Sequence, residues 1–193
     1  VMCDKPLAIT MGEANELAAT AHGSDRQFAV TYTYSGYPMA REARALIADG
    51  ALGAIRKVVV SYAQGWLARA IEKEGQKQAD WRTDPSRAGP GGCIGDIGVH
   101  AFHLAEFITG LRVSQLCADL SALVAGRVLD DDCNMLLRFE GGARGVLIAS
   151  QIATGEQNAL SIKVYGDRAG ISWAQENPNE LTMASIDGAT LVL

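Results

Sequence analysis

The stretch CNMLLRFEGGARGVLIASQIA, residues 133–153, decides the fold that we predict for this chain. Its two apolar runs, 133–139 and 143–153, flank Glu140-Gly141-Gly142, a sequence typical of a hairpin turn. Similar strand-like runs follow at about 158–165, 170–175, 180–185 and 189–193, with turns marked by Gly166-Asp167 and Asp187-Gly188. Because strands joined by such short turns cannot form parallel crossovers, we predict a largely antiparallel sheet.

Two more strands and a helix are predicted just before this stretch. The strands are the runs 55–63 and about 113–124, and the helix lies between them, from Asp96 to Thr109. An apolar stripe on the helix would pack against the sheet; it consists of Ile97, Ala101, Leu104 and Ile108. The predicted fold class is therefore α/β (α+β), an open, largely antiparallel sheet with helices on one face.

Two connections in this region lead to different interpretations. Residues 64–92 are polar and show little periodicity, and a connection of this length is typical of a functional loop. The acidic run Asp130–Asp132 is interpreted more simply, as a solvated loop before a strand.

The N-terminal part predicts a helix, a strand and a second helix. Thr10 and Glu13 form the capping box of the first helix, and the alternating run 28–34 is typical of a strand. The second helix would begin at Pro38 and end near Gly50, because proline favours the first turn and glycine the end. Its inner face would carry Met39, Ala43, Leu46 and Ile47.

Composition and charge exclude several classes of protein. The 193 residues are 48% hydrophobic and 20% charged, which is enough to bury a core, and the net charge is −5. Without a basic cluster we expect no nucleic-acid partner, and without an apolar run of about 18 residues no membrane span. No CxxC pair occurs among the cysteines, which fits reduced thiols in a cytoplasmic protein; they are Cys3, Cys93, Cys117 and Cys133.

Both ends of the chain predict a longer polypeptide. The sequence begins with Val1 on what looks like the end of a strand, and it ends on another strand-like run at 190–193. We therefore expect that the chain has been cut from a larger protein.

The predicted helix after residue 95 carries the clearest chemical signal. Asp96, His100, His103 and Phe107 share one stripe, and two of the three histidines of the chain lie on it. A carboxylate orients an imidazole and favours its charged form, whereas a helix N-terminus opposes that form, so such a histidine can carry a proton near neutral pH. Two other interpretations stay open: histidines that hydrogen-bond within a core, and a metal site made by Asp96, His100 and His103.

Glycines and a lysine complete the candidate site. Gly91, Gly92 and Gly95 precede the helix and allow close approach of backbone or ligand, and Gly98 inside it indicates close packing or a ligand. Lys5 lies between a strand end and Pro6, a setting in which a lysine can serve as an acid or base. From spacing alone, however, most lysines are solvated surface charges.

Taken together, these stretches resemble the Gfo/Idh/MocA family (glucose–fructose oxidoreductase/inositol dehydrogenase). Its Glu-Lys-Pro motif is matched by Asp4-Lys5-Pro6, with Asp in place of Glu, and its glycine-rich Asp-x-Gly-x-His motif by residues 96–100. The stretches 31–39, 80–82 and 164–173 are also similar, so that the resemblance covers the whole chain in order. The replacement of Glu by Asp4 should alter local hydrogen bonds without removing Lys5.

The resemblance implies an organisation in two parts. Residues 1–34 would be the last elements of an NAD(P)-binding Rossmann domain, and 35–193 a truncated α/β domain for substrate binding and oligomerisation. The main binding domain for NAD or NADP would then lie outside this chain, and the fragment by itself would be inactive. A homo-oligomer would form through the open β-sheet.

The resemblance also implies roles for individual residues. His100 would take the proton of a sugar, inositol or other polyol hydroxyl during hydride transfer, Lys5 would stabilise the oxygen, and Asp96 would orient His100 or bind a hydroxyl. Lys5 and Pro6 would touch the nicotinamide. Candidates for substrate contact are Trp81, Arg82, His103 and Tyr37, although Trp81 could simply pack and Arg82 could form a surface ion pair.

Two alternative functions stay open beside the oxidoreductase. One is a protein of the same fold that senses a dinucleotide or sugar without turnover, since fold alone does not determine function. The other is a metal-dependent hydrolase that uses Asp96, His100 and His103, for which bound metal and inhibition by a chelator are expected.

Overall fold

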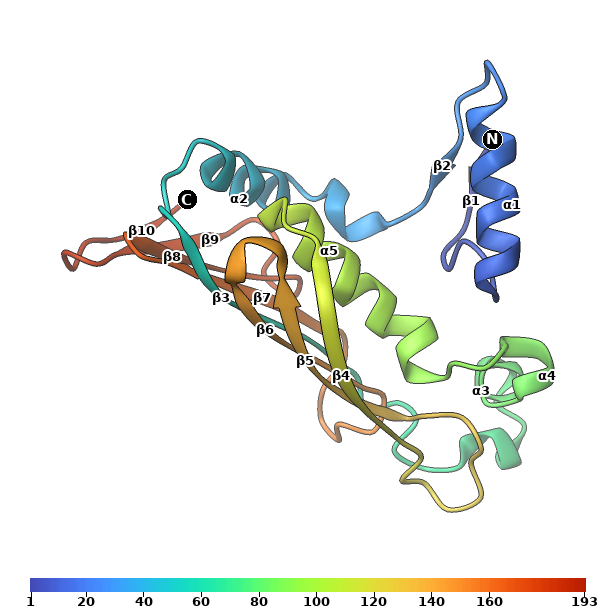
Figure 1. The fold of residues 1–193 in the computed structure, drawn as a ribbon. Helices are drawn as coiled ribbons and strands as arrows, with labels where there is room; N and C mark the ends of the chain where they lie inside the picture. The colour runs from blue at the N-terminus through green and yellow to red at the C-terminus, as the bar shows by residue number, and fades with distance from the viewer. The chain divides into compact units, whose positions relative to one another are not determined.

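The computed structural model describes residues 1–193, which form two compact units, Val1–Thr33 and Tyr34–Leu193 (Figure 1). In the first unit, strands β1 (Met2–Cys3) and β2 (Ala29–Val30) pair in parallel, with helix α1 (Met11–His22) between them in the chain. The predicted capping box is confirmed, since the Thr10 side chain accepts the Glu13 amide and the Glu13 carboxylate accepts the Thr10 amide.

The predicted strand over 28–34 is largely wrong. Only Ala29–Val30 are extended in a ladder, because their partner β1 is itself two residues long. The chain then enters a short 3₁₀ helix, η1 (Thr33–Gly36). Alternating β-branched and aromatic residues therefore do not form a longer strand where no partner strand is available.

The second unit is built on an eight-stranded sheet with the order β10-β9-β8-β7-β3-β6-β5-β4. All neighbouring strands are antiparallel except β3 and β6, so that the predicted largely antiparallel sheet is confirmed. The strands are β3 (Ile55–Ala63), β4 (Val113–Ser121), β5 (Asp132–Phe139), β6 (Arg144–Ser150), β7 (Ala159–Gly166), β8 (Ala169–Ala174), β9 (Leu181–Ser185) and β10 (Thr190–Val192). The predicted hairpin turn is the short 3₁₀ helix η4 (Glu140–Gly142), between β5 and β6.

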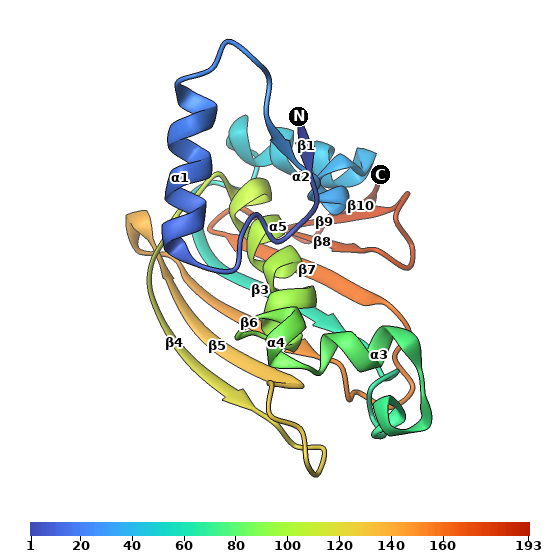
Figure 2. The same ribbon diagram turned by 90° about the vertical axis from the view of Figure 1, so that its right-hand side faces the viewer.

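Two helices, α2 (Pro38–Ala48) and α5 (Val99–Thr109), lie on one face of this sheet (Figures 1 and 2). Pro38 is the first residue of α2, as predicted, because its fixed φ suits the first helical turn. The predicted apolar stripe of α5 is buried against the sheet, and its members Ala101, Leu104 and Ile108 are fully inaccessible to solvent. The core thus lies between one layer of helices and one layer of strands.

The helix predicted from Asp96 begins earlier and in a different form. Residues Ile94–Gly98 make a π-helical turn, η3, which leads directly into α5. Gly98 is needed for packing, because a Cβ there would lie 2.5 Å from Cδ1 of Ile94 and 3.5 Å from Cβ of Ala149. The predicted close approach at Gly98 is therefore one of protein against protein.

The segment 64–92 is more regular than its sequence indicates. It contains three short helices, η2 (Ile71–Glu74), α3 (Lys77–Arg82) and α4 (Pro85–Ala88). Side chains cap two of them: Gln76 accepts the amide of Ala79, and Asp84 accepts the amide of Ser86. Helices of four to six residues are too short to show helical periodicity, which explains why the sequence pattern missed them.

The interpretation of Asp130–Asp132 as a solvated loop is wrong. Asp131 is only 1% exposed, and its carboxylate accepts the amides of Leu123 and Val124 and the guanidinium of Arg127. Asp130 accepts backbone amides at the start of η3. Asp131 is therefore buried because backbone and guanidinium donors satisfy its carboxylate, and Asp130 and Asp132 on either side are partly buried.

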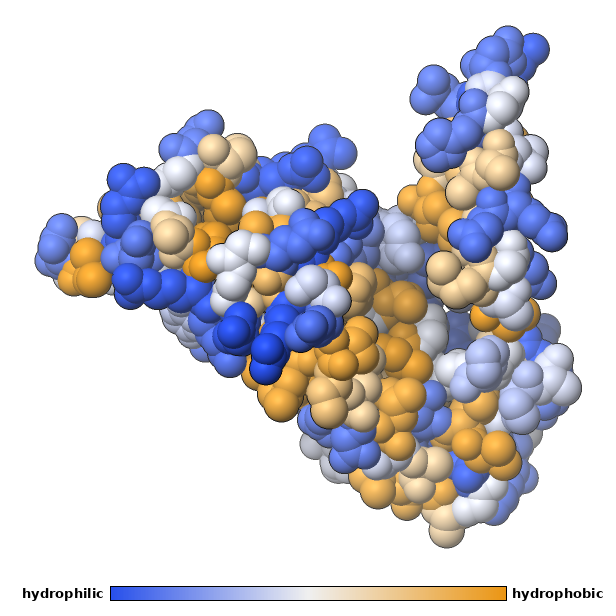
Figure 3. Space-filling view, in the orientation of Figure 1, coloured by the Kyte–Doolittle hydropathy of each residue, from blue (hydrophilic) through white to orange (hydrophobic).

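Strand β4 forms an edge of the sheet and keeps apolar side chains exposed. Leu116 and Leu120 are in register with the buried Leu137 and Cys133, yet they are 55% and 51% exposed. Figure 3 shows apolar surface over the second unit where Figure 1 places β4 and α5. None of the helices combines the length and the apolar character required to cross a bilayer.

Candidate active site

The parallel pair β3 and β6 determines where polar side chains gather. Both strands run in the same direction, so that the residues following them, Gln64 and Gln151, lie at the same edge of the sheet. The Gln64 amide donates to the Ser150 carbonyl at 2.8 Å, which holds these two strand ends together. The carboxyl ends of parallel strands are a common position for ligand sites.

Asp96 lies at this edge, on the π-helical turn η3. Its Oδ2 accepts Nε of Arg82 at 3.2 Å and Nε2 of Gln151 at 2.9 Å. The side chains of Arg82 and Asp96 are 26% and 21% exposed, so that the ion pair is partly buried. Two donors from different segments thus hold the carboxylate in one orientation.

His100 lies one turn further along, on α5, and is 8% exposed. The rings of Tyr34 and His100 meet edge to face, with centroids 4.9 Å apart, and the Tyr62 ring lies 6.3 Å from His100. Tyr34 comes from η1 and Tyr62 from β3, so that three elements enclose the imidazole. Both aromatic rings restrict how the imidazole can turn.

A directed chain of hydrogen bonds runs from these tyrosines. The Tyr62 hydroxyl donates to Oδ1 of Asn158 at 2.6 Å, so Tyr34 is the donor in the 2.5 Å bond between the two hydroxyls. Nε2 of Gln64 donates to the same Asn158 oxygen at 2.9 Å, and Nε1 of Trp66 donates to Oε1 of Gln64 at 3.0 Å. One acceptor, the Asn158 side chain, therefore orients the polar groups around His100.

The pKa of Tyr62 identifies what this residue can do. Burial raises its pKa well above the ordinary value, and the neighbouring Tyr34 and the charge of Asp96 raise it further. Tyr62 therefore remains a neutral hydroxyl at physiological pH. It can donate and accept hydrogen bonds but does not act as a base.

Among the candidates for substrate contact, Trp81 and Arg82 lie with Asp96. The Arg82 guanidinium stacks on the Trp81 ring at 4.2 Å and lies 6.0 Å from the Trp66 ring. It also donates to the Gln78 side chain. The segment 64–92 thus brings a cationic, aromatic cluster to the same edge of the sheet.

His103 and Tyr37 occupy different surroundings. The His103 ring stacks on Phe107 at 5.9 Å, and burial lowers its pKa, although Glu106 partly opposes this. Tyr37 stacks on Tyr34 at 6.1 Å and packs against Trp173 at 5.7 Å, one ring removed from His100. No group of His, Cys, Asp or Glu in this chain has the arrangement of a metal site.

Lys5 and Pro6 lie in the first unit, directly after β1. The Asp4 carboxylate accepts the Lys5 amide at 2.9 Å and the Thr31 hydroxyl at 2.7 Å. Aspartate at this position therefore ties the turn that carries Lys5 to the segment after β2. The participation of Lys5 beside His100 stays a prediction.

Several residues around His100 and Asp96 were not predicted. The tyrosines Tyr34 and Tyr62 lie in stretches that we interpreted as strands, where alternation indicates only which face is buried. Gln64, Gln151 and Asn158 each lie next to a strand end, and only the parallel pairing of β3 with β6 brings the first two together. The sequence pattern gave no signal for Gln151, which lies inside the run 143–153 that we interpreted as one strand, whereas β6 ends at Ser150.

This chain is similar to known oxidoreductases both in sequence and in structure. The family model described as the GFO/IDH/MocA C-terminal domain matches residues 40–172. The "Uncharacterized oxidoreductase YfiI" of Bacillus subtilis is 34% identical over 196 residues, which cover 100% of this chain and 50% of that protein.

Solved structures of dehydrogenases are also similar to this chain over its full length. An inositol dehydrogenase homologue of Azotobacter vinelandii, complexed with NAD⁺, is 37% identical with a TM-score of 0.94, covering 100% of this chain and 50% of that one. A levoglucosan dehydrogenase in complex with NADH and L-sorbose is 27% identical with a TM-score of 0.90, covering 100% and 53%. The chain thus spans about half the length of the proteins that it matches.

Proposed function

This chain belongs to the GFO/IDH/MocA family, and on that premise we propose that it is the substrate-binding, proton-transferring part of a nicotinamide-dependent oxidoreductase. The observation that supports this most directly is the grouping of Asp96, held by Arg82 and Gln151, with His100, enclosed by Tyr34 and Tyr62. Such a site offers several neutral hydrogen-bonding groups and one protected imidazole. These features suit a polyhydroxylated substrate, and we propose a sugar, inositol or other polyol.

The first unit fits a position beside the nicotinamide. Two parallel strands with an intervening helix are the unit from which dinucleotide-binding sheets are built, and their ligands lie at the carboxyl ends of the strands. Lys5 and Pro6 follow the carboxyl end of β1 and would hold the nicotinamide of NAD or NADP there. When bound, the cofactor accepts the hydride from the substrate carbon.

The residues of this chain would manage the proton and the orientation of the substrate. His100 takes the hydroxyl proton of the carbon that is oxidised, which prevents positive charge from remaining on the new carbonyl. Lys5 donates a hydrogen bond to that oxygen and Asp96 accepts one from a substrate hydroxyl or from His100. Trp81 and Arg82 contact the substrate. His103 and Tyr37 lie further from it and support the residues that contact the substrate.

The test requires the full-length protein. Polyols and sugars are screened for reduction of NAD⁺ and NADP⁺, and the best substrate is then assayed with His100→Ala and Lys5→Ala. Loss of an acid–base group should lower kcat by about 10²- to 10⁴-fold. His22→Ala is the matched control, because His22 is exposed at the end of α1, where its Nδ1 lies 2.8 Å from the Ala18 carbonyl.

Three results would reject this function or its mechanism. Wild-type rates in both His100→Ala and Lys5→Ala would exclude the proposed proton transfer. Tight binding of dinucleotide and sugar without turnover would indicate a sensing protein. Substrate cleavage that a chelator abolishes would indicate a metal-dependent hydrolase.

We further propose that the open face of the sheet joins a second copy of the protein. On this face Leu136 and Tyr165 are 65% and 43% exposed. Arg144 on β6 is in register with Lys57 on β3 at one side and with Arg138 on β5 at the other. Adjacent like charges are unfavourable unless an acidic partner covers them. Asp119 lies on the same face nearer its other end, so that a copy turned by half a revolution could bring acidic and basic ends together.

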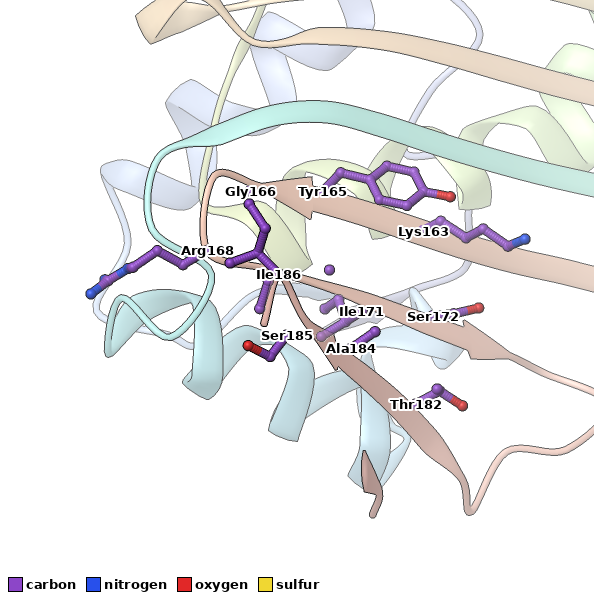
Figure 4. Close-up of a pocket in the computed structure, with 12 residues that line it drawn as sticks. Lys163, Tyr165, Gly166, Arg168, Ile171, Ser172, Thr182, Ala184, Ser185 and Ile186 are labelled. Carbon is purple, nitrogen blue, oxygen red and sulfur yellow. The ribbon is translucent and has the colours of Figure 1, made fainter. Parts of the chain in front are cut away.

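Two hollows on this face add area for such a contact. One of about 360 Å³ lies over β7, β8 and β9, and Figure 4 shows Lys163, Tyr165, Ser172 and Thr182 around it. The other, of about 530 Å³, is lined by Lys57, Leu136 and the two arginines. Sedimentation of the full-length protein should show an oligomer that Leu136→Asp dissociates and Leu123→Asp, which changes an exposed loop residue, does not. An unchanged assembly in Leu136→Asp would refute the interface.

A further inference from the structure

Asp130 holds three consecutive residues at the start of the π-helical turn η3. Its Oδ1 accepts the Gly92 amide at 2.7 Å, its Oδ2 accepts the Ile94 amide at 2.7 Å, and its carbonyl accepts the Cys93 amide at 2.7 Å. Every acceptor of this residue is thus used by the chain that leads into the candidate active site. A carboxylate is required for two of these bonds, because both of its oxygens must accept.

The contact between the two segments leaves no room for a larger residue. A Cβ at Gly92 would lie 2.2 Å from the Asp130 carbonyl oxygen and 2.9 Å from Cβ of Leu129. Gly92 is therefore glycine because its backbone lies directly against that of Asp130. The side chain of Cys93 is fully buried, which prevents this segment from shifting outward.

The turn transmits this anchoring to Asp96. The Asp96 amide donates to the Gly92 carbonyl at 2.9 Å, so the residue that Asp130 holds is also the one that positions Asp96. The next residue along, Asp131, accepts the Gln151 amide on its carbonyl at 2.9 Å, and Nε2 of Gln151 donates to Asp96 at 2.9 Å. Asp130 and Asp131 thus position both Asp96 and one of the two donors that orient it.

We propose that Asp130 is a positioning residue of the active site, which fixes the π-helical turn and, through it, Asp96 and His100. The proposal rests on the function proposed above, because it assigns a role in the same reaction. A misplacement of about 1 Å can reduce a rate by about 100-fold, so a carboxylate that sets the position of the turn affects catalysis without touching the substrate.

The test uses Asp130→Asn in the full-length protein. Asparagine has nearly the same shape, but its NH₂ group would face one of the two backbone amides, so one hydrogen bond is replaced by a donor–donor contact. We expect kcat to fall about tenfold or more with a smaller change in KM, and the pH profile of kcat to shift, because the surroundings of His100 change. Asp132→Asn is the matched control, since its carboxylate accepts only a neighbouring side chain, Asn134.

Amide hydrogen exchange separates this proposal from the proposed function. Residues 92–96 should exchange faster in Asp130→Asn than in the wild type and in Asp132→Asn, whether or not the protein oxidises any substrate tested. Faster exchange with wild-type kcat and pH profile would overturn the positioning role, and unchanged exchange would overturn the anchoring itself. If the wild type shows no turnover, the proposed function fails, and the exchange rates alone decide whether Asp130 holds the turn.

Discussion

Arg127→Met tests how the segment 64–92 is attached to the rest of the second unit. The Arg127 side chain is 2% exposed and forms ion pairs with Glu72 at 3.1 Å and with Asp131 at 3.3 Å. It also donates to the carbonyls of Leu67 at 2.6 Å and Arg69 at 2.8 Å. One guanidinium therefore connects η2, the strand-end loop at 67–69 and the loop before β5.

The expected loss of stability follows from this burial. Methionine fills a similar volume but leaves the buried Asp131 side chain, of which 2% is exposed, without its cation. Removing one partner of a buried ion pair costs about 3–5 kcal/mol. Since the Leu123 and Val124 amides still bind Asp131, we expect a value near the lower end, about 3 kcal/mol.

Urea unfolding monitored by tryptophan fluorescence measures this loss. Trp66, Trp81 and Trp173 all belong to the second unit, so that the signal reports on this unit alone. With a slope of about 2 kcal/mol per molar urea, the midpoint should decrease by about 1.5 M. Arg87→Met is the matched control: Arg87 pairs with Asp80 at 2.6 Å, but both side chains are at least half exposed, and the expected effect is below about 1 kcal/mol.

Equal midpoints for Arg127→Met and Arg87→Met would refute the reasoning. The double variant Arg127→Met/Asp131→Asn gives a second check. Because asparagine removes the unpaired charge, the double variant should lose less than the sum of the single losses.

Two further predictions concern helix α5 and the segment that leads into it. Gly92→Ala should destabilise the second unit by about 2 kcal/mol, because the added Cβ would lie 2.2 Å from the Asp130 carbonyl oxygen. Gly95→Ala is the control, because a Cβ added there meets no atom within 4 Å, and equal urea midpoints for the two variants would contradict the prediction. Burial lowers the pKa of His103 below its ordinary value of 6.5, because the folded state disfavours the charged imidazole. The stability that the neutral His103 contributes is therefore complete above about pH 6.5 and is lost as the pH falls through the lowered pKa. Urea midpoints at pH 7.5 and 5.5 should therefore differ less in His103→Gln than in the wild type or His22→Gln, and an equal difference in all three would contradict the assignment.

The sequence predicted most of the fold because the relevant signals are local. Alternation and short turns identified the strands from 55–63 to 190–193, and Thr10, Glu13 and Pro38 marked helix starts. Each of these features depends on residues within a few positions of one another. The strand predicted at 28–34 failed for the opposite reason, since a strand also needs a partner and β1 offers two residues.

For the candidate site, the sequence by itself determined that Asp96 and His100 lie on one helical segment after a glycine-rich stretch, and it indicated that Arg82 and Trp81 belong to a functional loop. Only the tertiary structure decided which groups surround them. Gln151 reaches Asp96 across 55 residues because the end of β6 lies against η3. Tyr62 reaches Asn158 across 96 residues because β3 pairs antiparallel with β7, so that the end of β3 meets the start of β7. The burial of Asp131 and the partial burial of Asp130 were likewise decided by backbone amides and by Arg127, since a carboxylate can leave water only where the folded chain supplies its donors.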